Sequence, residues 1–331
     1  MWYYSNPKGD EVMELFNFIG KNDNDMLSKL SEKDLDMFLN YLDNYYLKLR
    51  EELGFDKFIT FGLEFEFDTS MRVRIKERIK EYFENFNEQP WFFTIEKTCG
   101  FEVKTDILID NKRNWEDIKS VLKIIRDDAT IDASCGGHIH LGSQIIGEDR
   151  NTWLNFIKIW ELYENVIFRF TSGEFLITRP MAKSFAGHLS PLFNETYTKA
   201  IEENLSLKEI LKLISGRKRA INFQNITDLS TFESYNTIEF RCPNASLNPV
   251  IWQNNLNLFV NLILKSKDDL DLDEISYQNR DYDGIDLKQA LEFCDLVFNN
   301  NLDKVYFLRQ YLKSFKIGTR PYEMAKRFTR Y

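Results

Sequence analysis

The sequence, 331 residues long, is poor in the residues that mark fibrous, disordered or disulfide-rich proteins. Glycine and proline number only 14 and 7, which excludes a collagen-like chain or a Gly/Pro-rich low-complexity chain. The four cysteines (Cys99, Cys135, Cys242 and Cys294) are far apart and include no Cys-x-x-Cys pair. We therefore expect neither a disulfide framework nor a cysteine zinc site, and this usage favours the reducing cytoplasm.

Signals for membranes, nucleic acids and two common nucleotide-binding folds are also missing. The start of the sequence has no basic segment followed by an apolar one, and no apolar run has the length of a membrane span. The formal net charge of −9 argues against a broad basic face for nucleic acid or for anionic membranes. Neither G-x-x-x-x-G-K-[ST] nor G-x-G-x-x-G occurs, so P-loop and Rossmann folds lack their phosphate-binding motifs.

The sequence does contain enough apolar residues for a large core, with 43% hydrophobic and 15% aromatic residues. Alternation with period two predicts strands over 58–68, 91–96, 101–109, 136–146, 220–226 and 235–242. Helical spacing predicts helices over 73–86, 114–128, 150–172, 206–214, 249–267, 286–298 and 301–315, and residues 174–206 look irregular. The regular strand–helix alternation of a parallel doubly wound sheet is absent, so we expect an α+β fold with a mainly antiparallel sheet.

Three regions are expected along the chain. Residues 1–54 form a helical N-terminal extension, in which Ser31 resembles an N-cap. Residues 55–267 form the central domain, in which Asn114 and Asn248 are expected to cap helices, the second with Pro249 at the first helical position. Residues 268–331 form an acidic linker followed by helices that pack on the core and by a basic tail.

Three of the predicted strands each carry two polar side chains at alternating positions, and therefore on one face. The pairs are Glu64 and Glu66, His138 and His140, and Glu239 and Arg241. A single pair usually marks the wet face of an edge strand, but two of the three histidines of the chain stand in one pair. If the strands are neighbours, their face suits a polyphosphate and a hard cation such as Mg²⁺, or Mn²⁺ or Zn²⁺ where imidazole takes part.

The segments FGLEFEF, CGGHIHLG and NTIEFRCPNASLNP resemble, in the same order, three motifs of the glutamine-synthetase-like carboxylate–amine ligases. The closest resemblance is to the putative amidoligase family, which has Gly-x-Glu-x-Glu, Cys-Gly-x-His-Val-His and Thr-Val-Glu-Phe-Arg strands. An arginine and an asparagine before its last strand are matched by Arg219 and Asn222. The resemblance covers residues 58–265 and implies a glutamine-synthetase-like curved, mainly antiparallel sheet flanked by helices, here with extra helices at both termini.

The resemblance also implies two metal positions. Glu64, His138 and Glu239 would hold the ion beside the ATP γ-phosphate. Glu66 would hold the second ion with one further carboxylate, for which Glu102 is the best match and Glu96 the alternative. The nucleotide and its phosphates would contact His140, Asn222, Arg179, Arg219 and Arg241. Arg219, Arg241 and Glu239 would be the catalytic residues.

The chemistry implied by the resemblance is amide-bond formation. ATP phosphorylates a substrate carboxylate, and an amine attacks the acyl phosphate, with Mg²⁺ or Mn²⁺ as cofactor. The expected partners are small-molecule or peptide carboxylates and amines, with a protein substrate not excluded, and neither nucleic acid nor a membrane. Two other functions stay open: an inactive ligase-like fold that serves as a binding or scaffold protein, and a metal-dependent hydrolase that uses the same Glu/His set.

Overall fold

The computed structural model describes residues 25–88, 91–95, 99–226, 236–270, 282, 284–313 and 329–330. Within this part of the chain, one sheet of seven strands has the order β3-β4-β2-β6-β8-β7, and β5 pairs with β2. Its strands are β2 (Thr60–Phe67), β3 (Phe92–Thr94), β4 (Phe101–Lys104), β5 (Leu108–Ile109), β6 (Gly137–Gly142), β7 (Ile221–Asn222) and β8 (Thr237–Phe240). All its pairings are antiparallel, so the predicted α+β fold with a mainly antiparallel sheet is confirmed.

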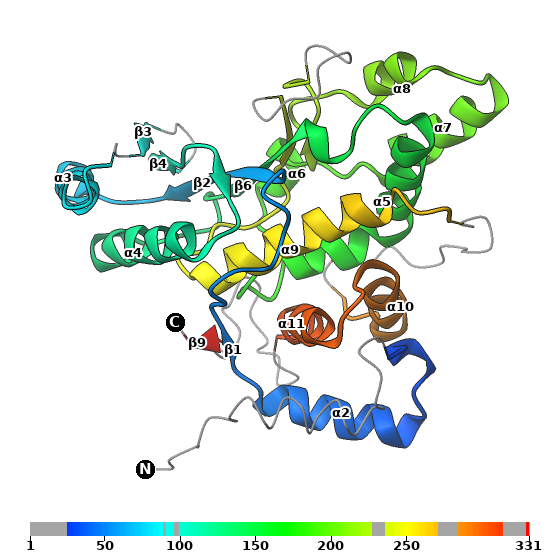
Figure 1. Ribbon diagram of the computed structural model, residues 1–331, viewed down its shortest axis with the longest axis horizontal. Coiled ribbons are helices and arrows are strands. Elements are labelled where there is room, and N and C mark those ends of the chain that lie inside the picture. The colour runs from blue at the N-terminus through cyan, green and yellow to red at the C-terminus, as the bar shows by residue number, and fades with distance from the viewer. Residues whose placement is uncertain are drawn as a thin grey trace.

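Helices cover one face of this sheet and continue beyond it in further layers (Figure 1). The helices of the described residues are η1 (Leu27–Lys29), α2 (Glu32–Asn44), α3 (Arg72–Glu84), α4 (Lys112–Asp128), η2 (Ser143–Ile145), α5 (Arg150–Thr171), α6 (Ala182–Phe185), α7 (Ser190–Glu202), α8 (Leu207–Ile214), α9 (Pro249–Lys265), α10 (Leu287–Val297) and α11 (Asn301–Leu312). α4 and α9 run beneath the sheet, α11 packs against α9, and α2 packs on α11 (Figure 1). None of the helices described is long and apolar enough to cross a membrane.

Capping side chains set several helix starts, two of them as predicted. Ser31 accepts the backbone N–H of Asp34 at the start of α2. Asn248 accepts the N–H of Val250, and Pro249, whose missing N–H costs nothing at this position, begins α9.

Three local predictions are wrong. Asn111, not Asn114, caps α4, because its side chain accepts the N–H of Asn114, and the helix therefore begins at Lys112. Residues 174–206 are not irregular throughout, because α6 and α7 lie within them, and α7 buries one face against α5. The strand predicted over 101–109 is interrupted after Lys104 and resumes at Leu108.

Large aromatic contacts seal the apolar face of the sheet against the helices. Phe61 of β2 stacks on Trp115 of α4 with ring centroids 5.7 Å apart. Phe65 meets Trp252 of α9 edge-on at 4.7 Å. The even-numbered side chains of β2 then have to face away from the helices, because successive residues of a strand point to opposite faces. The polar face of the sheet is therefore the face that these helices leave open.

The two terminal regions share the core of the central region. Buried apolar side chains from Leu27 to Leu312 form one contiguous cluster. η1 packs on α10, and β1 (Leu47–Lys48) pairs in parallel with β9 (Thr329–Arg330). Much of the expected acidic linker and basic tail lies outside the described residues, and the boundaries at 54/55 and 267/268 stay predictions.

Cys99 and Cys135 form a disulfide, so the expectation of no disulfide is wrong for this pair. They are 36 residues apart in sequence, but their Cα atoms lie 5.0 Å apart. The segments that hold them lead into β4 and β6, the two strands that flank β2, and they meet beyond its end. Cys242 and Cys294 are buried. The cytoplasmic location stays a prediction.

Candidate active site

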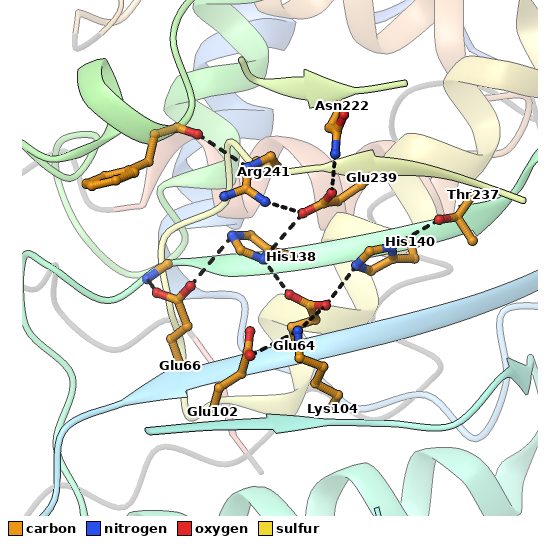
Figure 2. Close-up of polar contacts among 12 residues, drawn as sticks. Glu64, Glu66, Glu102, Lys104, His138, His140, Asn222, Thr237, Glu239 and Arg241 are labelled. Carbon is orange, nitrogen blue, oxygen red and sulfur yellow. Dashed lines mark hydrogen bonds and ion pairs between the residues drawn. The ribbon is translucent and has the colours of Figure 1, made fainter. Parts of the chain in front are cut away.

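The register of the sheet brings the predicted polar pairs onto one face (Figure 2). Glu64 on β2 lies opposite His138 on β6, and His140 lies opposite Glu239 on β8. The three strands are therefore neighbours, in the order β2-β6-β8, and the condition set in the sequence analysis is met. Their charged side chains gather over the middle of the sheet, on the face away from the aromatic core.

Glu64, His138 and Glu239 form a first group of potential metal ligands, whose donor atoms lie within 4.8 Å of one another. His138 Nδ1 lies 2.6 Å from Glu64 Oε2 and 3.6 Å from Glu239 Oε1. Asn222 on β7 donates to the other oxygen of Glu239 at 2.7 Å and so orients that carboxylate. Two carboxylates and one imidazole are donors that fit Mg²⁺, Mn²⁺ or Zn²⁺.

Glu66, Glu102 and His138 form a second group with the same spacing. Glu102 lies directly opposite Glu66 in the register of β4 with β2. His138 Nε2 lies 3.6 Å from Glu66 Oε1, and the other oxygen of Glu66 accepts the N–H of Gly136 at 2.5 Å. Glu102 thus stands beside Glu66, where a further carboxylate was expected, whereas Glu96 lies outside the described residues.

Burial and neighbouring charges move the pKa values of two of these carboxyl groups in opposite directions. Burial opposes ionisation of Glu64, but hydrogen bonds with His138 and His140, and their charges, outweigh it and hold the pKa of Glu64 well below its usual range. Burial, together with the charge and hydrogen bonding of Glu64, raises the pKa of Glu102 to about 8. At neutral pH the metal-free site therefore pairs an ionised Glu64 with a protonated Glu102.

Lys104 is a charged residue of this face whose role the sequence did not indicate. Its Nζ lies 2.8 Å from Glu64 Oε1 and 3.0 Å from Glu102 Oε2 (Figure 2). Burial would lower the pKa of Lys104, but the two carboxylates raise it above its ordinary value. The available signal was its position two residues after Glu102, which places both side chains on the same face of one strand.

Two arginines border the carboxylates on the side opposite β4. Arg241 Nη1 donates to Glu239, and Arg241 Nε donates to the carbonyl of Phe185 at 3.3 Å. Arg179 Nη1 lies 3.8 Å from Glu66 Oε2, and its side chain is buried. Room for Arg179 depends on Gly136, because a Cβ at that position would lie 1.7 Å from Arg179 Nη1.

Two adjoining cavities open over this face. The larger, of about 540 Å³, is lined by both ligand groups and by Lys104, Arg179 and Arg241. The smaller, of about 340 Å³, shares Glu64, Lys104 and His140 with it and extends over Gly62. His140 lies between the two, with Nε2 3.1 Å from Glu64 Oε1 and Nδ1 3.1 Å from Thr237 Oγ1.

A family model described as putative amidoligase enzyme matches residues 11–263, well over half of the chain. The chain belongs to this amidoligase family. Among curated proteins, no match is found. The matched region ends close to the predicted limit of 265 but starts far before 58. Most of the N-terminal extension therefore lies inside the region that defines the family, contrary to expectation.

One expected phosphate ligand of this amidoligase does not reach the larger cavity. Among the described residues, Arg217, Lys218 and Asn222 line this cavity, but Arg219 does not. The side chain of Arg219 lies against Gly216, where a Cβ would come within 2.6 Å of Arg219 Nε. The basic run 217–219 was the signal for Arg217 and Lys218.

Proposed function

We propose that this amidoligase uses ATP and a divalent cation to join a carboxylate to an amine through an acyl phosphate. The observation that supports this most is a single cavity of about 540 Å³ that combines carboxylate and imidazole ligands with guanidinium groups. Carboxylates beside an imidazole suit a divalent cation, and Arg179 and Arg241 suit phosphate oxygens, which a planar guanidinium binds with two parallel hydrogen bonds.

The cation, Mg²⁺ or Mn²⁺, would be held by Glu64, His138 and Glu239, with Glu66 and Glu102 as a second donor set. When bound, it supplies positive charge for the phosphate oxygens of ATP. Asn222 fixes the orientation of Glu239, whose other oxygen accepts a hydrogen bond from Arg241. Phosphoryl transfer depends on positioning and charge stabilisation more than on a protein nucleophile, and these side chains provide both.

Cysteine chemistry does not offer a competing route at this site. Cys242, three residues after the proposed ligand Glu239, is fully buried, and burial raises the pKa of its thiol to about 12. A thiol of that pKa holds almost no thiolate at neutral pH, and the thiolate is the nucleophile. Cys135, next to Gly136 just before the start of β6, is in a disulfide. Direct attack of the substrate carboxylate on ATP therefore fits the residues present better than a thioester route.

The partners we propose are a small-molecule or peptide carboxylate and an amine such as an amino acid, and a protein could carry either group. Arg217 and Lys218 extend the positive charge of the larger cavity beyond Arg241. The smaller cavity has Phe92 and Ile107 among its lining residues, both largely exposed. One charged and one partly apolar compartment, joined at Glu64, are what two substrates of different chemistry need.

The test is an assay of ADP formation with ATP, Mg²⁺ and pools of amino acids and peptides, with mass spectrometry of the products. ADP should form only when a carboxylate and an amine are both present, and the product should be their amide. Glu64→Gln should abolish this activity. Glu116→Gln, which alters an exposed glutamate of α4, is the matched control and should retain it.

Two results would overturn the ligase function. Hydrolysis of an amide or ester that needs the metal but not ATP would indicate a metal-dependent hydrolase. ATP binding without ADP formation under all pools would indicate a binding or scaffold protein. A hydrolase would not explain Arg241. Amide or ester hydrolysis without ATP involves no phosphate group for its guanidinium to bind.

A further inference from the structure

We propose that the ammonium group of Lys104 is a permanent cation of the site that takes the place of a second metal ion. The chain would then hold one divalent cation, on Glu64, His138 and Glu239. This inference rests on the metal-dependent function proposed above and narrows it, because two groups of ligands are present but only one would be filled.

The register of the sheet keeps Lys104 close to both ligand groups. Lys104 on β4 is the direct cross-strand partner of Glu64 on β2. Glu102 lies two residues earlier on the same strand and therefore on the same face. Directly opposed residues have Cβ atoms about 5 Å apart, so the ammonium group can reach both carboxylates. Its observed contacts, 2.8 Å to Glu64 and 3.0 Å to Glu102, follow from that placement.

The ammonium group engages one carboxylate of each ligand group (Figure 2). Glu102 is one of only two carboxylates in the second group, and the other, Glu66, accepts the backbone N–H of Gly136. A divalent cation between Glu66 and Glu102 would lie close to the Lys104 charge in a buried site, where repulsion between like charges is strong. Lys104 thus places a positive charge beside the second group, where a second ion would otherwise lie.

His138 explains why one nearby charge is enough to keep the second group empty, because both ligand groups include this residue. A neutral imidazole has one nitrogen that accepts and one that carries a proton, so it can ligate only one metal. Nδ1 faces Glu64 at 2.6 Å and Glu239 at 3.6 Å, whereas Nε2 has Glu66 at 3.6 Å. With Nδ1 on the metal, the second group has only its two carboxylates to hold an ion, and the charge of Lys104 then decides whether an ion binds there.

The experiment counts bound Mn²⁺ by electron paramagnetic resonance of the free ion, in protein first stripped of metal. The unaltered protein should bind one ion. Lys104→Met, which keeps an unbranched side chain only one atom shorter and removes its charge, should bind a second ion at Glu66 and Glu102. The double variant Lys104→Met/Glu102→Gln removes the carboxylate as well and should return to one ion, even if the single variant is less stable.

Two controls test whether the positive charge has to lie at position 104 to prevent binding of a second ion. Lys104→Arg keeps a cation at this place and should bind one ion. Lys218→Met removes a positive charge from the wall of the same cavity and should also bind one. Two ions in the unaltered protein, or one ion in Lys104→Met, would overturn the inference and leave the proposed ligase function standing. No ion in any of the proteins would overturn both.

Discussion

Replacing Glu102 with Gln should remove a specific pH dependence of stability in the metal-free protein. The side chain of Glu102 is buried beside Glu64, and both burial and that neighbouring charge raise its pKa from 4.5 to about 8. In the unfolded chain the group returns to its ordinary pKa. Between these two values the native state holds a proton that the unfolded state has released, so raising the pH favours unfolding.

The expected size follows from the shift. One bound proton changes the free energy of unfolding by about 1.4 kcal/mol per pH unit, so stability should fall by up to that slope between pH 4.5 and about 8. The total cannot exceed about 5 kcal/mol, and coupling to Glu64 reduces it. Glu64 does not mask the effect. Its pKa is lowered, so the stability it contributes is lost only as the pH falls below its unfolded value.

Urea unfolding across this pH range, in the presence of a chelator, measures the effect. Gln has the shape of Glu but cannot ionise, so the fall in stability should be shallower in Glu102→Gln by up to the stated slope. Subtracting the stability profile of Glu102→Gln from that of the unaltered protein cancels the contributions of other groups with raised pKa values, such as Asp117 and Glu174. Glu116→Gln should keep the original slope. Parallel profiles for the unaltered protein and Glu102→Gln would refute the assignment of the proton to Glu102.

Three further predictions concern the ligand, the guanidinium group and the disulfide. Mg²⁺-ATP should raise the melting temperature, because it binds only the folded state, and Glu64→Ala should stay folded without showing this rise; an equal rise in the variant would contradict the metal site. Arg241→Lys loses the planar fork and should lower turnover about 100- to 1000-fold with little change in melting temperature, whereas near-normal turnover with a large loss of stability would indicate only a structural ion pair with Glu239. Reduction of the Cys99–Cys135 disulfide, whose partners are 36 residues apart, should lower the free energy of unfolding by about 3–4 kcal/mol, and a Cys99→Ser/Cys135→Ser variant should no longer respond to the reductant.

Side-chain alternation explains why so much of this face could be predicted from sequence. A strand long enough to alternate, such as β2, fixes which residues share a face without any knowledge of its neighbours. Glu64 and Glu66 could be assigned in this way, since Phe65 and Phe67 have to enter the core. The alternation does not say which strands are neighbours, and the order β2-β6-β8 is a finding of the structure.

Contacts between segments far apart in sequence could not be predicted in the same way. Nothing around Cys99 or Cys135 indicates that the ends of β4 and β6 converge beyond β2. Asn111 and Asn114 are both good N-caps, and only the start of α4 at Lys112 decides between them. Lys104 could be placed only on the same face as Glu102, because it follows Glu102 by two residues on one strand. Its contact with Glu64 depends on the register of β4 with β2, which the sequence does not state.

Arg219 shows a limit of transferring residues by motif. β7 has only two residues, Ile221 and Asn222, and the side chain of Asn222 donates a hydrogen bond to Glu239. Residues 217 and 218 before it form a turn, so the alternation of an extended strand does not decide which of these basic side chains reach the site. Arg217 and Lys218 line the larger cavity and Arg219 is not among its lining residues, so phosphate contacts from this segment are expected from Lys218 and Arg217 instead.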